Sequence, residues 1–139
     1  MYELLEMGDV SEDTRGGEMM KEKKHGWIGV DLDGTLAEYN DYEGVDIIGD
    51  PVPAMVKRVK KWLKAGYEVR VLTARASNSL AIHAIEEWLE EYVGELLPVT
   101  DKKDHDMIVL WDDRCVPVYV NEGEPMVETD EEDVSPREE

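Results

Sequence analysis

The 139-residue sequence contains one cysteine, no phenylalanine and no long apolar run. A single cysteine excludes an intramolecular disulfide, so we expect a reducing, cytoplasmic location. No segment approaches the ~18 consecutive apolar residues of a membrane span. The N-terminal residues also lack the apolar centre of a secretory signal, so no membrane association is predicted. The core has to be built from aliphatic residues, methionine, tryptophan and tyrosine.

Basic residues are scarce. The chain has 15 Lys and Arg against 34 Asp and Glu, which gives a formal net charge of -19. Such a charge disfavours binding to long nucleic acids, because their phosphates repel an acidic surface. Five of the 15 cations cluster on one face of a helix expected after Pro53, and we interpret that face as solvated. They are Lys57, Arg58, Lys60, Lys61 and Lys64.

The composition divides the chain into three parts. Residues 1–24 are polar and predict a flexible N-terminal arm. Residues 25–121 contain the apolar residues needed for one domain with a single core. Residues 122–139 hold nine acidic side chains and one arginine, which predicts a disordered acidic tail.

Within 25–121, short apolar runs alternate with helical patterns. We expect helices from Pro53 to about residue 65 and from residues 77–79 to Gly94. We expect strands over 27–32, 67–72, 96–99, 107–111 and 116–120. Strands that alternate with helices favour right-handed crossovers and a parallel sheet. The predicted fold class is therefore α/β, a Rossmann-like, three-layer doubly wound parallel sheet of about five strands.

The stretch from Gly26 to Leu36 carries the strongest signal. A buried strand leads into Asp31 and Asp33, and Gly34 permits a sharp exit into a loop. Residues i and i+2 of an extended chain lie on one side, so both carboxylates can point the same way. Two like charges this close call for a cation between them, and a divalent metal satisfies that requirement.

Other polar side chains fall at or near the ends of later strands. Thr73 follows the second strand, Lys102 and Lys103 precede the fourth, and Asp112 and Asp113 follow it. The carboxyl ends of parallel strands share one edge of a sheet, so we expect these groups to converge in one crevice. The carboxylates suit Mg²⁺, and a hydroxyl and an ammonium suit phosphoryl oxygens. A carboxylate there could attack phosphorus, which indicates phosphoryl transfer.

These segments resemble the four motifs of the haloacid dehalogenase superfamily of phosphohydrolases. The resemblance covers about residues 26–120 and preserves motif order. The motifs are Asp31-Leu32-Asp33-Gly34-Thr35, Leu72-Thr73-Ala74-Arg75, a lysine at 102 or 103, and Leu110-Trp111-Asp112-Asp113.

The resemblance implies a role for each motif residue. Asp31 would be the nucleophile and Asp33 the general acid and base, while the Asp33 backbone carbonyl would contribute to the metal site. Thr73 and Lys103 would bind the phosphoryl group, and Ala74 and Arg75 would line the substrate site. Asp113 would bind Mg²⁺ directly, and Asp112 directly or through water. Thr35 is typical of the phosphatase branch.

No segment is long enough for the cap domain that many relatives insert, so the resemblance implies a capless member. An open site would accept a large substrate end or take a lid from a second subunit of a homo-oligomer. Tyr39, in the loop after the first motif, is the expected substrate contact. The substrate would be a nucleotide, a small phosphorylated metabolite or a nucleic-acid end.

Two other functions share parts of this pattern. A phosphoacceptor receiver domain also uses acidic residues, Thr, Lys and Mg²⁺, but carries its acceptor Asp on the third strand. Here the third strand ends at Val99-Thr100-Asp101 and the acidic signature lies on the first. A catalytically idle Mg²⁺-binding protein is the second alternative, and the full set of motif residues argues against it.

Overall fold

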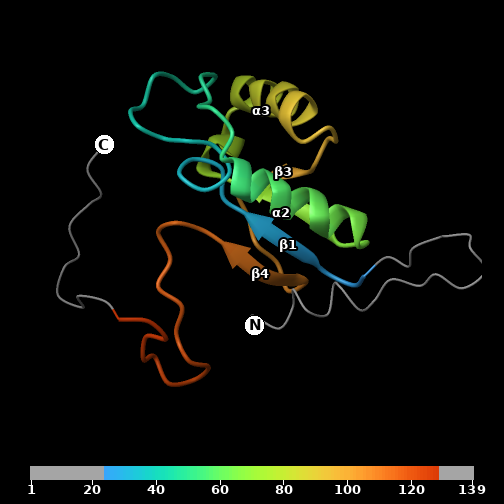
Figure 1. The fold of residues 1–139 in the computed structure, drawn as a ribbon. Helices are drawn as coiled ribbons and strands as arrows, with labels where there is room; N and C mark the ends of the chain where they lie inside the picture. Colours follow the sequence, from blue (N-terminus) through green and yellow to red (C-terminus); the bar gives the residue numbers. More distant parts are fainter. Residues whose placement is uncertain (1–23, 129–139) are drawn as a thin grey trace, which may run out of the picture.

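The computed structural model describes residues 24–128 (Figure 1). The predictions for the N-terminal arm up to residue 23 and for the acidic tail beyond residue 128 lie outside the described residues. Between residues 24 and 128, no helix is both long and apolar enough to cross a bilayer.

The centre of the fold is a four-stranded sheet in which every pairing is parallel. Its strands are β1 (Trp27–Val30), β2 (Glu68–Leu72), β3 (Val99–Thr100) and β4 (Met107–Trp111). They lie in the order β3-β2-β1-β4. The chain thus steps outward from β1 to β3 and then returns past β1 to β4. The predicted parallel α/β sheet is confirmed, with β3 shorter and three residues later than expected.

The fifth strand predicted over 116–120 is absent from the sheet of the described residues. This segment instead bonds to the chain that follows it, since Tyr119 N–H donates to the Glu124 carbonyl at 2.9 Å and Met126 N–H to the Pro117 carbonyl at 2.8 Å. Pro117 removes a backbone donor, which disfavours a strand inside a sheet. The first residues of the predicted acidic tail are therefore hydrogen-bonded to the segment before them.

Two helices follow β1 and β2. Helix α2 (Pro53–Lys64) begins with Pro at its first turn, where the missing N–H costs no hydrogen bond. A 3-10 turn, η2 (Ala74–Ser77), follows β2 and leads into α3 (Ser79–Tyr92). The Asn78 side chain caps α3 by accepting hydrogen bonds from the N–H groups of Leu80 and Ala81. Both helices were predicted, and α3 starts within the predicted range of 77–79.

Both helices pack on the same face of the sheet (Figure 1). The apolar side chains of that face come from alternate positions of β1 and β2 and join both helices in one core. The residues involved are Ile28, Val30, Val69 and Val71 of the strands, Val56, Val59 and Trp62 of α2, and Ile85, Trp88 and Leu89 of α3. The third layer of the predicted fold is not formed by the described residues.

The missing layer has a topological cause. The return from β3 to β4 runs against the direction of the first two crossovers, so a right-handed helix there would cover the opposite face. Only residues 101–106 make this return, and they contain no helix. On that face Trp27 is shielded by Arg70, whose guanidinium lies 4.4 Å from the indole centroid. Between residues 24 and 128, no inserted cap interrupts this arrangement.

Candidate functional site

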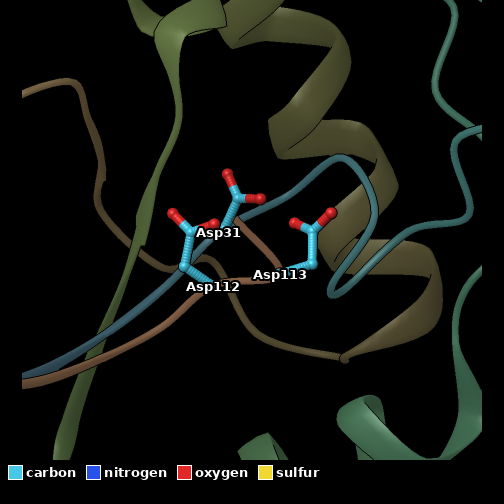
Figure 2. Close-up of side chains that lie close together, drawn as sticks. All are labelled: Asp31, Asp112 and Asp113. Atoms are coloured by element: carbon cyan, nitrogen blue, oxygen red, sulfur yellow. The ribbon is translucent and has the colours of Figure 1, made fainter. Parts of the chain in front are cut away.

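Three carboxylates meet where β1 and β4 end side by side. Val30 is in register with Trp111, and Asp31 N–H donates to the Trp111 carbonyl at 2.9 Å. The next residues are Asp31 on one strand and Asp112 and Asp113 on the other. Each supplies one carboxylate oxygen, and these oxygens all lie within 4.8 Å of one another (Figure 2). The predicted convergence of these three residues is therefore present.

The turn after β1 is built around the Asp113 carboxylate. Gly34 has φ +90°, and a Cβ atom there would lie 2.5 Å from Asp113 Oδ2. Thr35 Oγ1 donates to Asp113 Oδ1 at 3.0 Å and accepts from Asp113 N–H at 3.1 Å. It also lies 3.5 Å from Asp31 Oδ2. Thr35 thus bridges the loops after β1 and β4, a role that the sequence pattern did not indicate.

The close approach of these carboxylates changes the acidity of Asp31. Burial, a hydrogen bond with Asp113 and the charges of Asp112 and Asp113 raise the pKa of Asp31 from 3.8 to about 8. Repulsion of this kind is relieved when a cation lies among the oxygens. A set of hard oxygen donors fits Mg²⁺ or Ca²⁺ better than a soft metal. Asp31, Asp112 and Asp113 could therefore hold a divalent cation.

The three carboxylates open into a pocket of about 300 Å³. Eight of the residues predicted for the site line it together: Asp31, Asp33, Tyr39, Thr73, Ala74, Arg75, Asp112 and Asp113. Tyr42 and Arg114 complete the lining.

The predicted phosphate-binding lysine is not among the lining residues. Lys103 lies in the exposed 101–106 connection, and Lys102 Nζ pairs with Asp101 at 3.3 Å. This connection begins beside the site, where Thr73 N–H donates to the Thr100 carbonyl at 2.9 Å, and then runs back to β1, where Trp27 Nε1 donates to Asp104 at 2.8 Å. The sequence places the lysines before the fourth strand but does not give the path of this connection, so their absence from the pocket lining was not visible in it.

Thr73 and Arg75 both belong to the segment after β2, but they differ in what they contact. Thr73 is buried and caps η2, because its Oγ1 accepts from Arg75 N–H at 3.2 Å. Its hydroxyl can donate to an anion in the pocket. Arg75 donates to both Asp33 oxygens, from Nε to Oδ2 at 2.9 Å and from Nη2 to Oδ1 at 3.1 Å.

The Asp33 carboxylate is thus separate from the three carboxylates that could hold a cation. Its carboxylate points to Arg75, whereas the group of three carboxylates consists of Asp31, Asp112 and Asp113. Burial would lower the pKa of Arg75, but the hydrogen bonds and charge of Asp33 outweigh it and raise that pKa above its usual value. The two aspartates of the first motif therefore occupy different environments, as two different chemical roles would require.

No protein-family model and no curated protein matches the chain. Among solved structures, a conserved protein from Bacteroides thetaiotaomicron is similar, with a TM-score of 0.51 and 22% sequence identity. The match covers 67% of this chain and 79% of that one. At this identity the similarity concerns the fold, and it agrees with a Rossmann-like α/β arrangement.

Proposed function

We propose that the chain is a Mg²⁺-dependent phosphomonoesterase of the haloacid dehalogenase type that acts through an aspartyl phosphate. The observation that carries the proposal is the meeting of Asp31 with Asp112 and Asp113 across β1 and β4. In the order β3-β2-β1-β4, the chain leaves β1 on one side and returns to it on the other, so this junction is a topological switch point. Open α/β sheets bind their ligands there, at the carboxyl ends of the strands.

The proposed reaction uses the pocket residues in two steps. An Asp31 carboxylate oxygen attacks phosphorus, and the bond to the ester oxygen breaks while Asp33 gives that oxygen a proton. Asp33 then takes a proton from water, whose oxygen attacks the phosphorus and releases inorganic phosphate and the Asp31 carboxylate. The Thr73 hydroxyl donates to a phosphoryl oxygen and orients the group.

A divalent metal fits this donor set. Asp31, Asp113 and Asp112 would hold Mg²⁺, with the Asp33 backbone carbonyl as a further oxygen donor. The ion would offset negative charge on the transferring group and keep Asp31 ionised at neutral pH.

The receiver alternative fits the topology less well. Doubly wound receivers have the strand order 2-1-3-4-5, in which strand 3 is next to strand 1. Here β3 is at the sheet edge, and the acidic cluster follows β1 and β4. A group transferred to Asp31 would therefore lie at a different junction from that of a receiver.

The open pocket supports the proposed range of substrates. With Tyr39 and Tyr42 as its outer wall, the pocket would accept a nucleotide, a small phosphorylated metabolite or a nucleic-acid end. A second subunit could supply a lid over this side. The lone cysteine favours a cytoplasmic location for this activity.

The test is hydrolysis of p-nitrophenyl phosphate with Mg²⁺ and with EDTA. We expect turnover with Mg²⁺, none with EDTA, and none for Asp31→Asn. Asp101→Asn is the matched control, because Asp101 is exposed and outside both the three-carboxylate cluster and the pocket lining. Turnover by Asp31→Asn at the parent rate would refute the assignment. A screen of nucleotides, sugar phosphates and 3′- or 5′-phosphorylated oligonucleotides would then define the substrate.

A further inference from the structure

Arg75 connects Asp33 to a loop that is distant in the sequence. Besides its two bonds to Asp33, its Nη1 donates to the carbonyls of Gly44 and Val45, both at 2.8 Å. The Tyr42 ring lies over the guanidinium, with 5.7 Å from Cζ to the ring centroid. The Arg75 side chain is only 9% exposed. One buried cation thus holds the predicted acid-base residue and the middle of the 38–50 loop together.

The number of donors defines what Arg75 can do. A guanidinium has five N–H donors, and these contacts use four of them: two toward Asp33 and two toward the loop. Binding a phosphoryl group in the two-pronged manner typical of arginine needs two free donors. Arg75 would have to release Asp33 or the loop to bind phosphate in this way, so the structure favours a positioning role over the predicted substrate contact.

Hydrogen bonds hold the 38–50 loop at its base, near its end and in its middle. At its base, Glu38 N–H donates to the Asp50 carbonyl at 2.8 Å. Near its end, Trp88 Nε1 of α3 donates to the Gly49 carbonyl at 2.8 Å. Arg75 is the attachment in the middle. Because the loop supplies Tyr39 and Tyr42 to the pocket wall, a substrate that contacts the tyrosines would act on the segment that Arg75 holds.

We propose that Arg75 is a positioning residue that couples the seating of the 38–50 loop to the orientation of the Asp33 carboxylate. The coupling itself follows from the contacts, and its catalytic consequence rests on the proposed phosphatase function. A leaving group held by the loop tyrosines is the group that Asp33 would protonate. The Arg75 side chain, which contacts both the loop and Asp33, therefore connects leaving-group binding to proton transfer.

Hydrogen–deuterium exchange tests the coupling without any activity. Coupling is reciprocal, so a change at Asp33 must loosen the loop. We expect amides of 38–50 to exchange about fivefold faster or more in Asp33→Asn and Arg75→Lys than in the parent. Amides of β1 should stay protected, which shows that the variants are folded. Asp101→Asn, outside the loop, is the control. Unchanged exchange of 38–50 in both variants would overturn the proposal.

Steady-state kinetics test the consequence. Arg75→Lys keeps the charge but lacks the planar, two-pronged geometry of a guanidinium, so we expect kcat to fall about tenfold to a hundredfold. KM for p-nitrophenyl phosphate and inhibition by inorganic phosphate should change less than about threefold. Gly44→Ala, which strains a φ of +141° in the held loop, should also lower kcat with little change in KM.

The matched control is Arg70→Lys, since Arg70 lies on the opposite face of the sheet. A tenfold weaker inhibition by phosphate in Arg75→Lys, with kcat retained, would show a phosphate ligand and contradict the proposal. If the parent protein hydrolyses no phosphate ester, the proposed function fails, whereas the exchange measurement still decides whether Arg75 couples the loop to Asp33.

Discussion

Replacing Asp31 with Asn should stabilise the metal-free protein even though it removes the proposed nucleophile. Burial, a hydrogen bond with Asp113 and the charges of Asp112 and Asp113 raise the pKa of Asp31 from 3.8 to about 8 on folding. A folded state that holds this proton more tightly than the unfolded chain is favoured in acid. Its stability falls as pH rises from about 4 to about 8. Asn carries no charge and avoids this loss.

The size of the effect follows from the difference in proton affinity. A tenfold change in that affinity is worth about 1.4 kcal/mol. Without solvent screening, the loss of folding stability at pH 8 would therefore be about 5–6 kcal/mol. Asp31 is only half-buried, and solvent screens exposed charges strongly, so we expect roughly 1–2 kcal/mol. For a domain of this size, that raises Tm by on the order of 10 °C.

Thermal melts in EDTA at pH 4 and pH 8 measure the stability that Asp31→Asn gains. The variant and the parent should have similar Tm values at pH 4, and the variant should melt higher at pH 8. Asp41→Asn is the control, because it also removes one negative charge from a chain with a net charge of -19 but does so outside the three-carboxylate cluster. Added Mg²⁺ should raise the Tm of the parent and leave that of Asp31→Asn nearly unchanged. An Asp31→Asn protein that melts at or below the parent at pH 8 in EDTA would contradict the raised pKa of Asp31.

Three further substitutions test separate parts of the structure. Thr35→Val removes both hydrogen bonds to Asp113, so we expect about 1 kcal/mol lower stability by denaturant unfolding and weaker Mg²⁺ binding by calorimetry. Gly34→Ala places a Cβ against the Asp113 carboxylate, and Mg²⁺ affinity should fall about tenfold or more, a change of about 1.4 kcal/mol; unchanged affinity would mean that the turn adapts freely. Asn78→Ala removes the cap of α3 and should cost about 1 kcal/mol in unfolding free energy with kcat unaltered, and a loss of activity would contradict a purely structural role.

The sequence predicted most of the site because the relevant residues follow strands at positions fixed by periodicity. Asp31, Thr73 and Asp112 each come after an apolar run, and parallel pairing places such positions at one edge. The same reasoning placed Lys103 near them, but Lys103 is exposed in the 101–106 connection and does not line the pocket. Chain order does not fix the path of a connection that has no periodic pattern.

The contacts of Arg75 were beyond sequence reasoning for a different reason. Its loop partners are the backbone carbonyls of Gly44 and Val45, which every residue possesses, so no residue type indicates them. The predictions of a fifth strand and of a third layer were wrong because they depend on contacts between distant segments, which the sequence does not show. The apolar residues of 116–120 pair with the chain that follows, and the return to β4 is too short to carry a helix.

The one-sided packing of the helices gives the two surfaces of each strand unequal tolerance to substitution. Val69 and Val71 are enclosed by helices, so a shortened side chain there would leave a void. Arg70, between them in the sequence, faces the side without helices and shields Trp27 by stacking. Natural variation along β2 should therefore alternate. Aliphatic residues should be preserved at the positions of Val69 and Val71, whereas the position of Arg70 should accept different residues as long as a flat group covers the Trp27 indole.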